Sequence, residues 1–161
     1  GPLTFSEQEW RLTFRITAQN VGRSVAINAS INAELFAPKL GGDVFALVMA
    51  KQRQICQHAN SPFHSYAIFP KQTFTSETNF PISRPEVGNE HVPDAILLYL
   101  VGCVDYQVSG YETHHQTRFI YDVYRTHPEN PNIRLGLTFG EDVPLERLIV
   151  EKSMVRGDYA D

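Results

Sequence analysis

Hydrophobic and polar residues alternate strictly in residues 10–18, where Trp, Leu, Phe, Ile and Ala occupy every second position. A period of two with one polar side is typical of a half-buried strand. The same pattern resumes in residues 25–35, after Asn20 and Gly22, which both tolerate a positive φ in a short turn. The pattern therefore predicts two antiparallel strands joined as a hairpin.

A helical pattern follows the two glycines at positions 41 and 42. Asp43 is placed to cap a helix, because its side chain can accept hydrogen bonds from the next backbone amides. We expect an amphipathic helix from Asp43 to about His58, ending before Pro62, with its apolar side in the core. The stripe and its flanking residues are Val44, Val48, Lys51 and Ile55, with Phe45, Leu47 and Met49 beside them.

Two short strands are predicted next, in residues 66–69 and 72–80, each closed by a proline. Proline cannot donate to an interior ladder, so both are expected at sheet edges. Residues 83–93 contain two prolines, a glycine and several charged side chains, which is typical of a long loop.

The most secure hairpin is predicted in the second half of the chain. Residues 95–108 begin apolar on both faces, which is typical of a central strand, and residues 113–124 return after Ser109 and Gly110. Residues 133–139 and 143–150 are predicted as terminal strands, with a helical turn as the alternative at 145–149.

The number and spacing of these elements predict the fold class. With 161 residues the chain is expected to form one domain, since domains average about 150 residues. We expect a mainly β protein, an immunoglobulin-like antiparallel β-sandwich with one inserted amphipathic α-helix. A barrel of five or six strands with a helical plug is the alternative. Residues 1–9 and 151–161 are expected to be frayed, and Gly1-Pro2 resembles the scar of a tag-cleaving protease.

Three short segments carry a resemblance to a known group of proteins. They are the Asn20–Asn28 stretch, with Asn, Gly and Ala leading into an apolar alternation, then Phe69-Pro70, and then Gly102 through Tyr106 into His115, Thr117 and Phe119. These segments resemble uncharacterised bacterial membrane-anchored proteins, in which one or two N-terminal membrane helices precede a C-terminal immunoglobulin-like domain. The likeness covers about residues 10–125.

The sequence departs from that group at two places. Its members often carry a cysteine where this chain has Ile120, and the hairpin turn here is one residue longer. The resemblance implies a membrane-tethered soluble domain, on either side of the membrane. It implies no chemistry, because the group has no established activity.

Charge and hydropathy narrow the possible partners. Fourteen Lys and Arg against eighteen Asp and Glu give a net charge of −4, so we expect no binding to nucleic acid. The longest nearly unbroken apolar run, residues 95–104, is well short of the roughly 20 residues that span a bilayer. Any membrane helix is therefore expected outside this sequence.

The two cysteines, Cys56 in the predicted helix and Cys103 in the predicted central strand, allow one disulfide in an oxidising compartment. By the chain-entropy model a loop of about 48 residues would contribute roughly 3–4 kcal/mol. Two separate buried thiols are the alternative.

No pattern in the chain is typical of a cofactor or a catalytic site. The six histidines and two cysteines lack zinc-ligand spacing, so we expect no metal and no other cofactor. No nucleophile motif is present, and we expect the protein not to be an enzyme. The alternative is a hydrolase in which Asp105, His115 and Asp122, on neighbouring strands, perform acid–base chemistry.

The candidate contact surface is the tip of the second hairpin. Tyrosines cluster in this hairpin, and tyrosine is favoured in binding surfaces. We expect Tyr111, Glu112 and His114, with Arg84 and Glu86 of the 83–93 loop, to contact a protein partner or a second copy of the chain. The sequence thus predicts a noncatalytic binding, sensing or assembly module. A domain that only stiffens or dimerises its membrane anchor is a further alternative.

Overall fold

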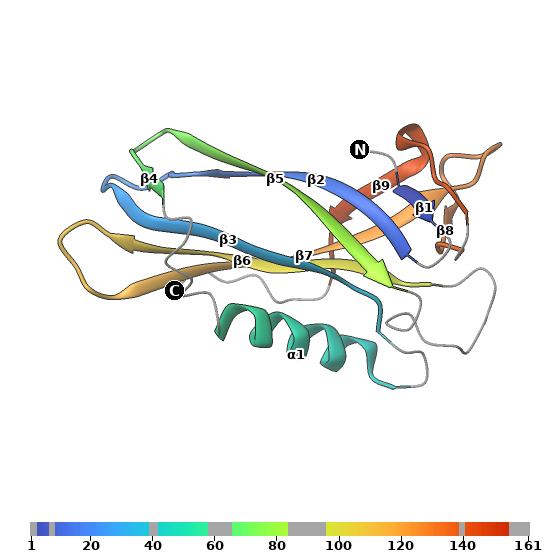
Figure 1. Ribbon diagram of the computed structural model, residues 1–161, viewed down its shortest axis with the longest axis horizontal. Coiled ribbons are helices and arrows are strands. Elements are labelled where there is room, and N and C mark those ends of the chain that lie inside the picture. The colour runs from blue at the N-terminus through green and yellow to red at the C-terminus, as the bar shows by residue number, and fades with distance from the viewer. Residues whose placement is uncertain are drawn as a thin grey trace.

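The computed structural model describes residues 3–6, 9–38, 42–57, 66–83, 96–138 and 141–154. These residues form two antiparallel sheets that face one another, with a helix on the outer side of the larger sheet (Figure 1). The smaller sheet has the order β1-β2-β5, with β1 (Leu3–Ser6), β2 (Glu9–Gln19) and β5 (Thr73–Ser83). The prediction of a mainly β protein with antiparallel sheets and one helix is confirmed.

The larger sheet has the order β4-β3-β6-β7-β8, and β9 also pairs with β7. Its strands are β3 (Ala26–Phe36), β4 (Tyr66–Ile68), β6 (Leu98–Val108), β7 (His114–Thr126), β8 (Arg134–Leu135) and β9 (Leu148–Lys152). A 3₁₀ turn, η1 (Leu145–Arg147), precedes β9, so the helical-turn alternative is correct for that segment. Only two residues of the strand predicted at 133–139 pair in β8.

Helix α1 (Val44–Gln57) begins at the predicted cap. The Ala46 amide donates to Oδ1 of Asp43 over 3.1 Å, which satisfies an amide that has no partner within the helix. The helix lies on the face of the larger sheet opposite the smaller sheet (Figure 1). The alternative of a barrel with a helical plug is therefore wrong.

The buried face of α1 differs from the predicted stripe. Val48, Gln52, Ile55 and Cys56 are buried, whereas Phe45 is 60% exposed, so the prediction that Phe45 packs in the core is wrong. The buried residues form one helical stripe, which is rotated relative to the predicted stripe so that it includes Gln52. Gln52 is polar, so hydropathy alone does not predict its burial. The side-chain amide nitrogen of Gln52 donates to the Phe119 carbonyl of β7 over 3.0 Å. Phe119 lies outside the part of β7 that pairs with β9.

Strand β6 is central, as its two apolar faces predicted. Leu98 and Leu100 face the smaller sheet, while Tyr99 and Val101 pack against α1. Alternate residues of a strand point to opposite faces, so a strand with a layer on each side needs apolar residues at every position.

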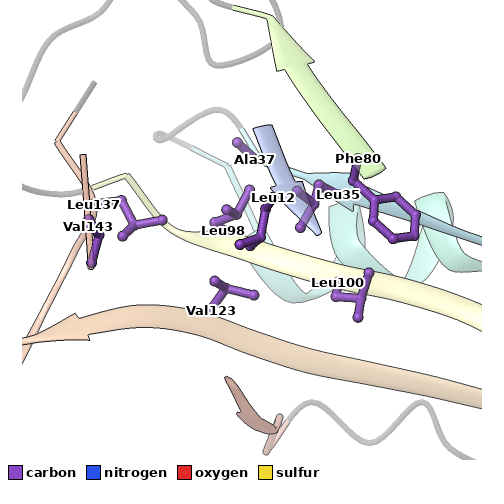
Figure 2. Close-up of a cluster of buried hydrophobic side chains, with 9 residues drawn as sticks. All are labelled: Leu12, Leu35, Ala37, Phe80, Leu98, Leu100, Val123, Leu137 and Val143. Carbon is purple, nitrogen blue, oxygen red and sulfur yellow. The ribbon is translucent and has the colours of Figure 1, made fainter. Parts of the chain in front are cut away.

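The main core lies between the sheets, at the end where β1, β8 and β9 gather (Figure 2). Its buried members come from both sheets and from the segment around β8. They are Leu12, Leu35, Ala37, Phe80, Leu98, Leu100, Val123, Leu137 and Val143.

The predicted hairpin between residues 10–18 and 25–35 is wrong, although both strands exist. β2 pairs with β5 over its whole length and β3 pairs with β6, so the connection crosses from one sheet to the other. Positive φ occurs among the described residues at Asn28, Lys71 and Gly110, and not at Asn20 or Gly22. Alternation predicts a strand and its buried face, but it does not specify the partner strand.

The side chain of Asn20 holds this crossing in place. Its Nδ2 donates to the carbonyls of Ser24 and Ile68, both over 2.8 Å, and its Oδ1 accepts from the Gly22 amide over 2.9 Å. These bonds tie the end of β2 to β4 of the other sheet.

The second hairpin is confirmed. β6 pairs with β7 from Leu98↔Val123 to Gln107↔His114, and Gly110 takes a φ of 90° in the turn. β4 and β5 are edge strands, as their prolines predicted.

The ends of the chain are paired further than expected. Leu3–Ser6 forms β1 against β2, and β9 continues to Lys152. The expectation of frayed ends is wrong for these residues. Most of the predicted 83–93 loop and residues 155–161 lie outside the described residues.

Candidate binding site

A pocket of about 670 Å³ lies between the two sheets, at the end where β2 crosses to β3. Ile16 and Ala18 of β2 lie on one side of it, and β6 and β7 contribute Val104, Tyr106 and Phe119. The crossing residues 20–24 also line the pocket. Its volume is within the range of about 300–1,000 Å³ that is usual for ligand sites.

Small side chains and a short strand explain why this end is hollow. Leu12 and Phe80 fill the space between the sheets at the other end, but Ala18, Ala26 and Ala29 occupy the positions here. β1 pairs only with Glu9–Leu12, so beyond Leu12 the part of the smaller sheet that the structure describes has two strands, which leave part of β7 uncovered by described residues. Phe119 is consequently only half-buried.

The walls of the pocket are mostly apolar and partly aromatic. The rings of Phe119 and Tyr121 lie 5.8 Å apart, and Tyr106 stacks on His115 with ring centres 5.7 Å apart. The charged side chains that the described lining presents to the pocket are those of Arg23 and Lys152, both basic. Arg118 also borders the pocket, but its side chain lies on the opposite face of β7, where it donates to Gln116. The pocket thus suits an apolar group with a neutral or acidic part nearby.

A polar cluster lies on the opposite face of the larger sheet, beside the end of α1. Asp105 is 2% exposed. Its Oδ1 lies 2.8 Å from Nδ1 of His114, and its Oδ2 accepts from the Gln116 amide nitrogen over 3.0 Å. The same Gln116 nitrogen donates to the Cys56 carbonyl over 2.8 Å, so the cluster connects the sheet to the last turn of the helix.

The three residues of the predicted hydrolytic site do not converge. Asp105 pairs in register with Gln116, and its face of β7 carries His114 rather than His115. His115 points to the pocket face, where it stacks on Tyr106. Asp122 lies six residues beyond Gln116 along β7, which is about 20 Å in a strand.

The predicted contact residues of the hairpin tip are together in the structure. Tyr111 is 70% exposed at the turn, and the Glu112 carbonyl accepts from the Gln107 amide nitrogen over 3.1 Å. That nitrogen also lies 3.1 Å from Nε2 of His114. The tip adjoins the pocket, since Val108 lines it. Arg84 and Glu86 lie outside the described residues.

A disulfide joins Cys56 of α1 to Cys103 of β6, with the Cα atoms 5.9 Å apart. This separation is ordinary for a disulfide. The bond attaches the last turn of the helix to the central strand, next to the Asp105 cluster.

Two tyrosines have altered acidity. Burial, with the nearby Asp122 carboxylate as a smaller cause, raises the pKa of Tyr99 above its ordinary value of 10.0. Burial also raises the pKa of Tyr124, and a hydrogen bond to Glu151 is a smaller cause of the same shift. Both effects disfavour the charged phenolate.

The described residues contain no group of three or more His, Cys, Asp or Glu side chains that could hold a metal ion. No helix in the described part of the chain is long and apolar enough to cross a membrane.

The pocket residues were not identified from the sequence. Ile16, Ala18 and Phe119 belong to ordinary alternating strands, so their pattern predicts burial and not a cavity. The available signal was the small side chains of Ala18 and Ala29 on the predicted inward faces, because small residues on facing strands leave unfilled volume. Alternation places Ala26 on the other face, and it joins them only because the pairing of β3 is irregular between Ile27 and Ser30.

Comparisons with known proteins add no information about this pocket or the polar cluster. No protein-family model, curated protein or solved structure matches the chain. The candidate site therefore depends on its geometry alone.

Proposed function

We propose that this chain is a noncatalytic binding module that takes an apolar ligand group into the pocket between its sheets. The observation that carries the proposal is the pocket itself, about 670 Å³ in volume and walled by residues such as Ile16, Val104 and Phe119. Half-buried aromatic rings at such a site supply contact area at little entropic cost.

We further propose an immunoglobulin-like domain of a membrane-tethered bacterial protein, with a protein as its partner. The two facing antiparallel sheets support the first part, and the resemblance over about residues 10–125 supports the tether. The exposed Tyr111 beside the pocket supports contact with a protein.

The hydrolase alternative has less support from the geometry. His115 lies on the opposite face from Asp105, and Asp122 is remote along the strand. The Asp105–His114 pair has no thiol nucleophile beside it, since Cys56 and Cys103 are bonded to each other.

The proposal is tested with anilinonaphthalene sulfonate, an apolar anion whose fluorescence rises in apolar pockets. We expect saturable binding to the wild-type protein and a loss of at least tenfold in affinity for Ala18→Phe, which fills the pocket. Thr75→Phe adds the same ring to the outer face of β5, where Thr75 is exposed, and should bind as the wild type does. Absent binding, or equal binding by both variants when circular dichroism shows them folded, would overturn the proposal.

A further inference from the structure

The smaller sheet has one edge that is paired over only part of its length. β2 pairs with β5 from Glu9 to Gln19, but on its other edge β1 pairs only with Glu9–Leu12. Along residues 14–19, none of the described strands lies on that edge. An edge of this kind presents backbone donors and acceptors that another strand can pair with.

The pocket lies beside this same edge. Its lining includes residues of β2, β6, β7 and β9, with Ala26 and Ala29 of β3 and Ile68 of β4, but none of the described residues of β5. Because β7 and β9 take part, the pocket extends to the side of β2 away from β5, which is the side that β1 occupies further along the strand.

From this juxtaposition we propose that the natural occupant is an extended segment of a partner protein, which adds to β2 as a strand and continues the line of β1. This inference rests on the proposed binding function and specifies its ligand. In a strand the N–H and C=O of every second residue point to the same edge, a spacing that an extended backbone matches and a compact molecule does not.

The register of β1 specifies which partner side chains enter the pocket. Leu3 pairs with Leu12, so the next positions along the edge lie opposite residues 13–19. Cross-strand neighbours share a face of the sheet, so residues opposite Phe14, Ile16 and Ala18 point toward the pocket side. The partner segment therefore carries apolar side chains at three alternate positions.

Charge adds a second requirement. Arg23 and Lys152 line the pocket, and Lys152 pairs with Tyr121, whose ring contacts Phe119 on the pocket face. An acidic residue at one end of the segment would be attracted by these cations and would favour the complex.

The test uses a pool of six-residue peptides with capped ends. Glu is the first residue, Thr is third and fifth, and Val, Ile, Leu or Phe occupies the second, fourth and sixth positions. Binding to the ¹⁵N-labelled protein is followed by NMR. We expect shifts of the amides of residues 14–19 and of Tyr106 and Phe119, and we expect Ala18→Phe to abolish them.

Backbone pairing is tested by methylating amide nitrogens of the peptides. One pool is methylated at the even positions and the other at the odd positions, so that each removes the N–H groups of one strand edge. Only one pool should retain binding, with at least a tenfold difference in affinity between the two. Because the pools carry the same number of methyl groups, each controls for the other.

The outcomes separate this inference from the proposed function. Binding of the dye but not of the peptide pool, or equal binding of both methylated pools, overturns the strand pairing and leaves the pocket as a ligand site. Failure of both dye and peptides overturns both proposals. A dimer by sedimentation, with concentration-dependent shifts confined to residues 14–19, identifies a second copy as the occupant and overturns the partner segment.

Discussion

Gly102 of β6 lies between Ala33 of β3 and Phe119 of β7. A Cβ at this position would overlap the Asn32 carbonyl oxygen and lie 2.9 Å from the Cα of Ala33 and 2.8 Å from the Phe119 ring. Two of these three neighbours are backbone atoms of the adjacent strand, which cannot move without disturbing the ladder. A glycine is required here by close approach and not by its own torsion angles.

We therefore predict that Gly102→Ala lowers the free energy of unfolding by about 1–3 kcal/mol, the usual cost of overpacking. Urea denaturation of the two proteins measures the difference. Gly110→Ala separates steric overlap from torsional strain, because nothing lies near a Cβ there but φ is positive. Equal stability of Gly102→Ala and wild type would contradict the close approach.

The burial of Tyr99 leads us to predict that the protein loses stability in alkaline solution. Burial raises its folded-state pKa above the unfolded value of about 10, so above that pH the unfolded chain loses its proton first. The stabilisation is fully present below about pH 10 and is lost as the pH rises through the folded-state pKa. Tyr99→Phe should show a smaller fall in stability between about pH 9 and about pH 11, measured by urea denaturation.

Tyr111→Phe is the control, since it removes a hydroxyl from the exposed hairpin tip. If both phenylalanine variants lose stability with pH in parallel with the wild type, burial of Tyr99 is not the source of the effect.

At the level of single residues, the sequence predicted the local role of a side chain better than its burial. Asp43 was identified as a cap because its type and position suffice for that role. Gln52 and Asp105 were not expected inside, since their burial depends on contacts between separate elements. Gln52 donates to the distant Phe119 carbonyl, and Asp105 lies beside the last turn of α1, whose Cys56 carbonyl accepts from the same Gln116 nitrogen as Asp105 does.

Among the elements, α1 is attached to the larger sheet by apolar contacts, by hydrogen bonds and by a covalent bond. Val48 and Ile55 pack on Val101 and Ile120, Gln52 donates to β7, and Cys56 is bonded to Cys103. The apolar contacts are spread along the helix, whereas the disulfide fixes its last turn.

Reduction of this disulfide should lower the free energy of unfolding by roughly 3–4 kcal/mol by the chain-entropy model. The measurement is urea denaturation with and without dithiothreitol. A variant with both Cys56→Ser and Cys103→Ser should be less stable than the oxidised protein and should not respond to the reductant. A wild-type protein that is equally stable with and without dithiothreitol would refute the expected contribution.

The elements also show where pattern-based prediction ends. The strands, the helix and the hairpin of β6 and β7 follow from alternation, helical spacing and a glycine turn. The crossing between β2 and β3 does not, because six residues between two strands are compatible with a hairpin or with a change of sheet. Here the hydrogen bonds of Asn20 to Ser24 and Ile68 hold the crossing, and the second of these partners is remote in sequence.

For the whole molecule, the two ends of the sandwich differ. One end is filled by large side chains from both sheets (Figure 2), and the other contains the crossing and the hairpin tip (Figure 1). The pocket lies at this second end. The filled end supplies most of the burial between the sheets, so the pocket end can remain partly open without loss of the fold. This division of roles follows from how the sheets face one another, which no local pattern in the sequence reports.

The disulfide also changes how the chain is connected. Cys56 and Cys103 are 47 positions apart, and their bond closes a covalent ring that contains β4, β5 and the first half of β6. A single cut of the backbone anywhere inside this ring, between residues 57 and 102, opens the ring but leaves every atom of the chain covalently joined. In a protein nicked there, β4 and β5, an edge strand of each sheet, stay covalently linked to the helix. The two fragments separate only after the disulfide is reduced.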